Sequence, residues 1–584
     1  MSDRRGKNGR GSLRVLGVVG VAAVAVAACG GSRDTSTPSK AAQKGGTLRV
    51  LYQGDVDSID PGRTYYSAGY IITNATQRTL TSYRPAAPNR AAPDLASSPP
   101  VVSPDGRTVT VKIRPGVRFS PPVNREVTSR DVKYAIERGF FKTVANAYVG
   151  SYFGGLAGAK QDVPPGTRIR GIQTPDASTI VFRLTRPTGS ALAGALALPL
   201  SAPVPPEYAA RFDAHNPTDY GTHQVATGPY MIANDASGRT VGYKPNAAVR
   251  LVRNPNWRAA TDYRPAYLDR IQIAEGNDDT SLAAEKVLAG RHMVTGEFPV
   301  PADVISRAMK DARGQIALLP TGSLDYIPLN TAIAPFDDMN VRRAVLAGID
   351  RDALRKTQGG VIRGPLATHL IPPSLPGFAQ AGGRAGDRLD FIANPRGDMA
   401  VAARYFRAAG FATGRYEGGT PVLLVSINDP STKLMAQLVE RSLRRMGFDV
   451  RTRYATIETF YTKFCGTPAM KVNACVGWQW LRDFPDGQTM LDPTFNGRAI
   501  QRTFNTNVPQ LDVPAINAAM SRAEALTDPR ARAGAWAAVD RQVTAQAPAI
   551  LGTWNNQPIV RSKDVAAVPN PAIAGWDLSF TSLR

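Results

Sequence analysis

The stretch from residue 422 to residue 454 constrains the fold more than any other part of this chain. Val422–Ile427 is a run of apolar and β-branched residues typical of a buried strand. Residues 431–446 then carry apolar side chains at helical spacing up to Gly447, and residues 448–454 predict a second strand. A strand, helix and strand at this spacing predict a βαβ unit, which is built on a parallel sheet. We therefore expect an α/β protein.

Five apolar residues of the 431–446 helix are expected to form its buried face: Leu434, Leu438, Val439, Leu443 and Met446.

Other segments predict further strands and helices. Residues 45–51 and 108–114 alternate apolar and polar side chains, as half-buried strands do. The sequence Thr128–Asp131 has the pattern of a capping box, which starts a helix. Residues 341–349 predict another amphipathic helix. A chain of 584 residues is too long for one hydrophobic core, so we expect two or three domains.

Residues 1–28 predict a signal peptide. A basic segment precedes an apolar run, Val15–Ala28, which is too short to span a bilayer as a helix. Cys29 follows at once, and the small-small-Cys ending resembles the lipobox of bacterial lipoproteins. That resemblance implies cleavage before Cys29 and a lipid on its sulfur; the alternative is an ordinary signal peptide. Residues 29–44 are small and polar, and predict a flexible tether with a reach of about 20–25 Å.

The chain is strongly basic, with a net charge of +23. Such a charge suits a nucleic acid, an anionic surface or an anionic ligand. The arginines, however, are scattered singly, with no basic run of five residues. We therefore predict a solvated basic surface and no nucleic-acid partner. After Cys29 no apolar run approaches the 18 residues of a membrane span.

Two cysteines remain after Cys29. Cys465 and Cys475 lie ten residues apart in a chain expected to reach an oxidising compartment. We predict a disulfide between them; the alternative is two buried free thiols. Without neighbouring histidines they do not predict a metal site, and no cofactor is expected.

Several stretches, spread over nearly the whole chain after residue 45, resemble the extracellular solute-binding proteins of family 5, the receptors of ABC importers. They are Gly45–Val50 with Ser58–Pro61, Ser103–Thr108, Arg114–Phe119, Ser129–Arg138, Thr227–Tyr230 with Val252–Trp257, Leu329–Arg351, Ile371–Pro373 and Trp480–Asp486. The resemblance implies an α/β, two-lobed periplasmic-binding-protein-like fold (type 2) with an extra inserted domain and a hinge between the lobes.

The implied division of the chain is as follows: signal peptide 1–28, tether 29–44, lobe I 45–90, inserted domain 91–200, lobe I again 201–320, lobe III 321–545, and lobe I once more 546–584.

The resemblance further implies a function. We expect a monomeric substrate-binding lipoprotein on the extracellular face of the cell membrane of a Gram-positive envelope, held through Cys29. It would capture dipeptides or oligopeptides and deliver them to a permease with its ATPase subunit. Nickel or other metal chelates and saccharides stay open as ligands. A surface lipoprotein that binds an envelope polymer or a protein is the alternative from another class.

The resemblance also implies a ligand-binding carboxylate. In oligopeptide receptors of this family, the Asp of a Trp-x-x-Asp-[Tyr/Phe] stretch pairs with the α-ammonium of the peptide, and Trp480–Phe484 has that spacing. Asp483 is therefore the candidate. Two alternatives stay open: Asp483 caps a turn with Pro485–Gly487, or Arg482 neutralises it.

Aromatic residues accompany this candidate. Trp478 and Trp480 alternate and, in a strand, would share one face that either lines the cleft or packs in the core. Leu481 belongs to the same candidate stretch. Tyr65 and Tyr66 lie in a region that faces the cleft in relatives, and serve either as ligand contacts or in lobe packing. No catalytic residues are predicted, because the sequence lacks the nucleophile-elbow, phosphate-loop, dinucleotide-binding and zinc-protease motifs.

Overall fold

The computed structural model describes residues 42–584, which form one compact unit. The signal peptide, Cys29 and most of the predicted tether lie outside the described residues. Within them, no helix combines the length and the apolar character that crossing a bilayer requires.

The first sheet contains the N-terminal strand predicted at 45–51. Its strand order is β12-β1-β11-β10-β8, with β1 parallel to β11 and β12, and β10 antiparallel to its neighbours. On β1, Leu48 and Val50 are buried against Ile71 and Ile72 of α1 (Ser67–Thr76). The strands are β1 (Thr47–Leu51), β8 (Tyr230–Ile232), β10 (Ala248–Arg253), β11 (Arg270–Ala274) and β12 (Met293–Thr295), with the short β9 (Tyr243–Lys244) also paired to β10.

The second sheet is antiparallel, with the order β4-β5-β7-β6, and includes the strand predicted at 108–114. The capping box is confirmed: the Thr128 side chain accepts from the backbone of Asp131, whose carboxylate accepts from the Thr128 backbone, and α2 (Ser129–Arg138) begins there. The apolar face of α2 packs on this sheet. The strands are β4 (Val101–Val102), β5 (Thr108–Lys112), β6 (Ile172–Asp176) and β7 (Thr179–Arg183).

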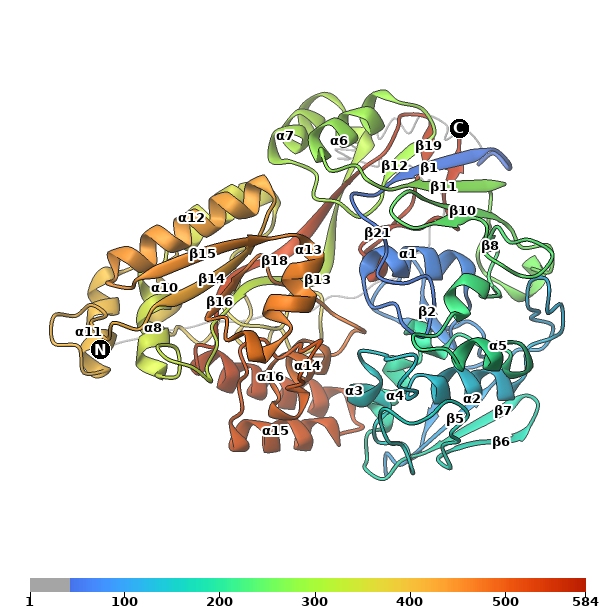
Figure 1. Cartoon of the computed structure of the whole chain (residues 1–584), viewed down its shortest axis with the longest axis horizontal. Helices are drawn as coiled ribbons and strands as arrows, with labels where there is room; N and C mark the ends of the chain where they lie inside the picture. The colour runs from blue at the N-terminus through green and yellow to red at the C-terminus, as the bar shows by residue number, and fades with distance from the viewer. Residues whose placement is uncertain (1–41) are drawn as a thin grey trace, which may run out of the picture. The chain divides into compact units, whose positions relative to one another are not determined.

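The third sheet confirms the predicted βαβ unit (Figure 1). Strand β14 (Val422–Ile427) pairs in parallel with β15 (Val450–Ala455) and with β16 (Ala474–Val476), and α12 (Pro430–Arg445) connects the first two. Gly447 ends the helix with a φ of +102°, a left-handed conformation that favours glycine.

The prediction that Leu434 belongs to the buried face of this helix was wrong. Leu434 is 54% exposed, whereas Val439 and Leu443 are buried. At 100° per residue, Leu434 lies opposite the buried face of α12, which centres on Ala436, Val439 and Leu443. The helix predicted at 341–349 is confirmed as α8 (Met339–Gly348).

Two long strands connect the sheets. Strand β13 (Ile316–Pro328) pairs antiparallel with β18 (Ala549–Val560), from Ile316 opposite Val560 to Pro328 opposite Ala549. One end of this pair packs with the core of the first sheet, through Leu319 and Ile559. The other end packs with the core around the βαβ unit. The strand pair therefore runs from one hydrophobic core to another.

The predicted division into lobes stays a proposal, and the names lobe I, lobe III and inserted domain denote the predicted residue ranges. The described residues form four hydrophobic cores. One core spans residues 324–554, a second 80–225 with Phe484, and a third joins 48–75, 230–319 and 559–583. A small fourth core lies under α6 (Thr280–Ala289) and α7 (Ala302–Asp311). The inserted domain thus shares its core with residues on both sides of 91–200.

Candidate functional site

Asp483 lies two residues after β17 (Gln479–Leu481), between Trp480 in the lobe III core and Phe484 in the core of the inserted domain. Its carboxylate accepts hydrogen bonds from the phenols of Tyr152 and Tyr65. Tyr152 belongs to α3 (Val149–Phe153) of the inserted domain, and Tyr65 precedes α1 of lobe I. Within residues 42–584, Asp483 forms no ion pair with a lysine, arginine or histidine. Three distant segments therefore meet at a carboxylate that has no cationic partner among the described residues.

The surroundings favour the neutral form of this carboxyl. Burial raises the pKa of Asp483 to about 7, although the hydrogen bonds from Tyr152 and Tyr65 act in the opposite direction. Burial, and next the charge of Asp483, raise the pKa of both phenols well above the usual value. The two tyrosines therefore stay protonated as donors, and Asp483 is the group that titrates.

Arg482 does not neutralise Asp483. Its guanidinium donates to the Asn89 side-chain oxygen at 2.5 Å and to the Pro88 carbonyl at 3.0 Å. Burial lowers the pKa of Arg482 to about 10. The turn that follows is capped by Asp486, whose carboxylate accepts the backbone N–H of Gln488. Asp486 rather than Asp483 therefore caps the turn, and Arg482 binds other acceptors. The role of Asp483 as a ligand contact stays a proposal.

Tyr65 is held in position through its backbone. The Asp57 carboxylate accepts the N–H groups of Tyr65 at 2.5 Å and Tyr66 at 3.2 Å, and the Thr64 hydroxyl at 2.8 Å. Burial raises the pKa of Asp57 to about 6. The Tyr66 ring is 38% exposed, with its centroid 6.2 Å from that of Tyr461.

Trp480 contacts the site, and its ring is mostly buried. Its centroid lies 6.2 Å from that of Tyr65, nearly perpendicular, and its indole N–H donates to the Thr489 carbonyl at 2.7 Å. Leu481, the next residue, is half-buried and pairs with Ser323 in the sheet. Trp480 thus packs in the lobe III core and contacts Tyr65.

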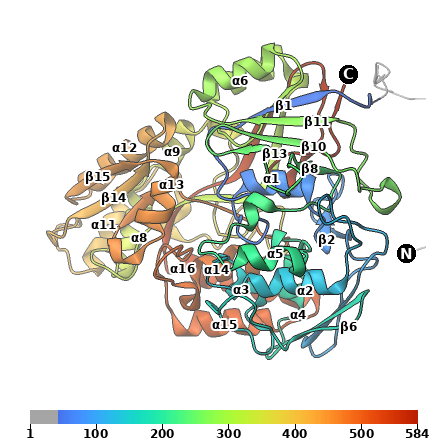
Figure 2. The same cartoon turned by 45° about the vertical axis from the view of Figure 1, so that its right-hand side comes forward.

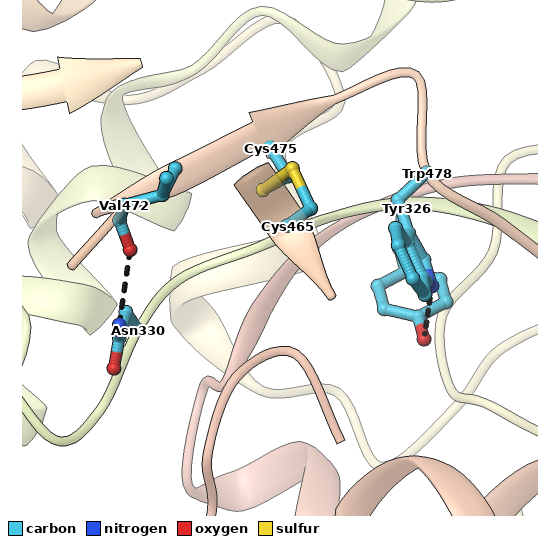
Figure 3. Close-up of a disulfide and its surroundings, with 6 residues drawn as sticks. All are labelled: Tyr326, Asn330, Cys465, Val472, Cys475 and Trp478. Atoms are coloured by element: carbon cyan, nitrogen blue, oxygen red, sulfur yellow. Dashed lines mark hydrogen bonds between the residues drawn. A yellow bond between two sulfur atoms is a disulfide. The ribbon is translucent and has the colours of Figure 1, made fainter. Parts of the chain in front are cut away.

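Trp478 has different neighbours, because Gly477 adopts a φ of +104° and separates it from β16. Its indole N–H donates to the Tyr326 hydroxyl at 3.0 Å (Figure 3), and its ring lies 4.8 Å from that of Tyr461. The prediction that Trp478 and Trp480 share one face required both to lie in the same strand. Trp478 lies outside β17, so this requirement is not met. Both indoles are buried in the lobe III core, and their contact with a ligand stays untested.

The predicted disulfide between Cys465 and Cys475 is present (Figure 3). Cys465 ends the π-helical turn Phe460–Cys465, which carries Tyr461, and Cys475 lies in β16. The bond therefore connects the turn beneath Trp478 to the strand that leads to Trp478, Trp480 and Asp483.

Three residues near the site were not predicted: Tyr152, Asp57 and Tyr461. Tyr152 lies in a short helix without a recognisable motif, so no local pattern could have indicated it. Among the described residues, no group of three or more His, Cys, Asp or Glu is arranged to hold a metal ion.

Comparisons with known proteins bear on the fold and the family. Residues 90–502 match the family described as bacterial extracellular solute-binding proteins, family 5 Middle. The chain is 25% identical to di/tripeptide-binding protein 3 of Pseudomonas aeruginosa over 411 residues, 68% of this chain and 70% of that protein.

Two solved structures resemble the whole described unit. The clavulanic acid biosynthesis oligopeptide binding protein 2 is 31% identical, with a TM-score of 0.79, over 93% of this chain and 96% of its own. An ABC transporter-associated periplasmic binding protein from Helicobacter pylori, in complex with the peptide STSA, is 18% identical, with a TM-score of 0.73, over 93% and 98%. These likenesses confirm the predicted two-lobed α/β fold. The chain belongs to family 5 of the bacterial extracellular solute-binding proteins.

Proposed function

We propose that this chain is the substrate-binding lipoprotein of an ABC importer, that it captures dipeptides or oligopeptides outside the cell, and that it is not an enzyme. The observation that carries the proposal is Asp483, a mostly enclosed carboxylate that receives only phenol hydrogen bonds from the described residues. A buried carboxylate is stabilised most by a cation with hydrogen-bond donors, which the α-ammonium of a peptide supplies. The names of the relatives, which bind dipeptides, tripeptides and oligopeptides, support the same ligand class.

In this function Asp483 binds the peptide amine, and Tyr65 and Trp480 form the apolar wall beside it. Main-chain groups can hold the peptide backbone, so that binding tolerates different side chains. Tyr66, Trp478 and Leu481 remain candidates for side-chain contacts.

The leader supports the remaining parts of the proposal. A lipid on Cys29 and a tether of about 15 residues would keep the loaded receptor on the extracellular face of the membrane, near its permease and ATPase.

The first experiment identifies the ligand. Native mass spectrometry of the protein purified under mild conditions is expected to show a mixture of bound peptides. A single saccharide or metal chelate instead would contradict the peptide proposal.

The second experiment tests the role of Asp483. Asp483→Ala is expected to lower peptide affinity at least about tenfold, because it removes the partner of a desolvated ammonium. Asp278→Ala, at an exposed aspartate of lobe I, is the matched control and is expected to leave affinity unchanged. Unchanged affinity in Asp483→Ala would remove Asp483 from the site.

The pH dependence of binding supplies an independent measurement. Because the ammonium needs the ionised carboxylate, affinity is expected to fall by up to about tenfold per pH unit below pH 7. In Asp483→Asn this dependence should disappear. Affinity that rises as the pH falls would contradict the assignment.

A further inference from the structure

Three consecutive residues of lobe III contact separate segments outside it. Arg482 contacts the loop between β2 (Thr81–Tyr83) and β3 (Ala91–Pro93), Asp483 contacts Tyr152 and Tyr65, and Phe484 enters the core of the inserted domain. Figure 2 shows α3 next to α14 (Gln488–Phe495), which begins just after this triplet, and α4 (Gly189–Ala195) beyond α3. The candidate carboxylate is thus flanked on both sides by contacts between protein segments.

Phe484 is the apolar half of these contacts. Its side chain is 3% exposed, and its ring lies 5.1 Å from that of Tyr152 in an edge-to-face arrangement. It also lies directly on the backbone of α4. A Cβ placed on Gly194 would come within 2.6 Å of the Phe484 ring, closer than real Cβ contacts. The close approach therefore depends on glycine at position 194.

Arg482 is the polar half. Its side chain is almost fully buried, and its described acceptors are the Pro88 carbonyl and the Asn89 amide oxygen, both on the far side of the boundary. If the lobes separate, the guanidinium loses these acceptors, although water can then replace them. A third contact, between Arg186 of the inserted domain and Glu524 of lobe III at 3.3 Å, joins the same two parts as Phe484 and Gly194. Arg186 is half exposed, so this pair adds little.

We propose that Arg482 and Phe484 are positioning residues that hold the lobes closed without a ligand and thereby place Asp483 against Tyr152 for binding. We name the pair of contacts, Arg482 with Pro88 and Asn89 and Phe484 with Gly194, the closure contact. A receptor that is already closed in a large fraction of molecules binds more tightly, because the apparent dissociation constant is the intrinsic one divided by the competent fraction.

The first test measures closure and needs no ligand. Small-angle scattering is recorded on the full chain carrying Cys29→Ser, without ligand, and on Phe484→Ala and Gly194→Ala in that background. Both substitutions are expected to raise the radius of gyration. Phe484→Ala removes the ring, and Gly194→Ala places a Cβ in the space that the ring occupies. Radii equal to that of the parent in both variants would overturn the proposal.

The double variant makes the test specific. In the background of Phe484→Ala, the substitution Gly194→Ala meets no ring and is expected to change nothing further, so the two effects are not additive. Additive effects would show that Phe484 does not lie on Gly194 in solution. Gly534→Ala in α16 (Pro529–Ala545) is the matched control, since a Cβ there meets no described atom within 4 Å. Alanine at either helical glycine favours the helix itself, so a general loss of folding is not expected.

The affinity measurement rests on the function proposed above, whereas the scattering measurement does not. With the peptides recovered by native mass spectrometry as probes, Gly194→Ala and Arg482→Gln are each expected to weaken binding about fivefold, because the closed fraction falls. If Asp483→Ala abolishes binding while these variants leave both radius and affinity unchanged, the closure contact is refuted and the peptide function stands. If no peptide binds but the radii rise as expected, the closure contact stands and the ligand class is wrong.

Discussion

Two carboxylate sites at boundaries between parts of this molecule differ in their partners. Arg138, fully buried in α2, donates to both oxygens of Asp60 and both oxygens of Asp213 at 2.7–3.0 Å. Tyr134 and Thr218 complete the hydrogen bonding of Asp213. Asp483, in contrast, accepts side-chain hydrogen bonds only from phenols among residues 42–584. The carboxylates of the first site have a buried cationic partner, whereas Asp483 has none among the described residues. This difference separates a structural ion network from a candidate binding site.

The largest expected effect concerns the complete network. Arg138→Met should lower the free energy of unfolding by about 3–5 kcal/mol, because it leaves Asp60 and Asp213 buried without a cation. Urea unfolding followed by circular dichroism measures this loss. Arg130→Met, at an exposed position of the same helix, is the control and should change stability by less than about 0.5 kcal/mol. Equal stability of the two variants would remove the distinction drawn between the sites.

The next effect concerns the covalent support of the binding side. Replacing Cys465 and Cys475 together by serine should lower stability by about 3 kcal/mol, from the loop of sequence separation 10 that the disulfide closes. It should also weaken ligand binding, because the turn that carries Tyr461 is no longer tied to the strand before Trp478. Denaturant titration and calorimetry with the bound peptides measure the two losses. A loss of stability with unchanged affinity would show that the disulfide supports the lobe but not the site.

The smallest effect comes from the charge of Asp483 itself. Since burial raises its pKa to about 7 in the folded state, above the value of about 4 for an unfolded aspartate, the folded state holds the proton more tightly. Its contribution to stability is therefore complete below pH 4 and is lost as the pH rises through 7. At pH 8 the free energy of unfolding of Asp483→Asn should exceed that of the parent by about 1 kcal/mol, and at pH 4 the two should be equal. The effect is small because solvent reaches the partly buried carboxyl. Thermal unfolding at both pH values checks this, and a parent that is the more stable at pH 8 would contradict it.

Local patterns predicted local structure well. The strand at 422–427, the helix after it and the parallel strand at 450–455 follow from apolar spacing and a terminal glycine, because backbone conformation depends mainly on neighbouring residues. The capping box at Thr128 follows from two side chains three residues apart. Leu434 shows the limit of the method, since an apolar residue can lie on the exposed face of a helix whose other face is already covered.

The candidate site was only partly predictable. Asp483 was selected through the resemblance to a family, but its donors come from residues 65 and 152, more than 300 positions away. Whether Arg482 would neutralise it depended on where a flexible guanidinium points, which its acceptors at Pro88 and Asn89 decide.

The sequence by itself determined the α/β class, the elements of the βαβ unit, the two cysteines able to pair and the aspartate worth testing. The first three rest on spacing along the chain and on residue chemistry, and the aspartate rests on the resemblance to a family. Only the tertiary structure decided which carboxylates have cationic partners, that Phe484 lies on Gly194, and that Trp478 and Trp480 have different neighbours. The physical reason is that burial and partnership are set by segments that fold together from distant parts of the chain, and both control the pKa of Asp483 and the closing of the lobes around it.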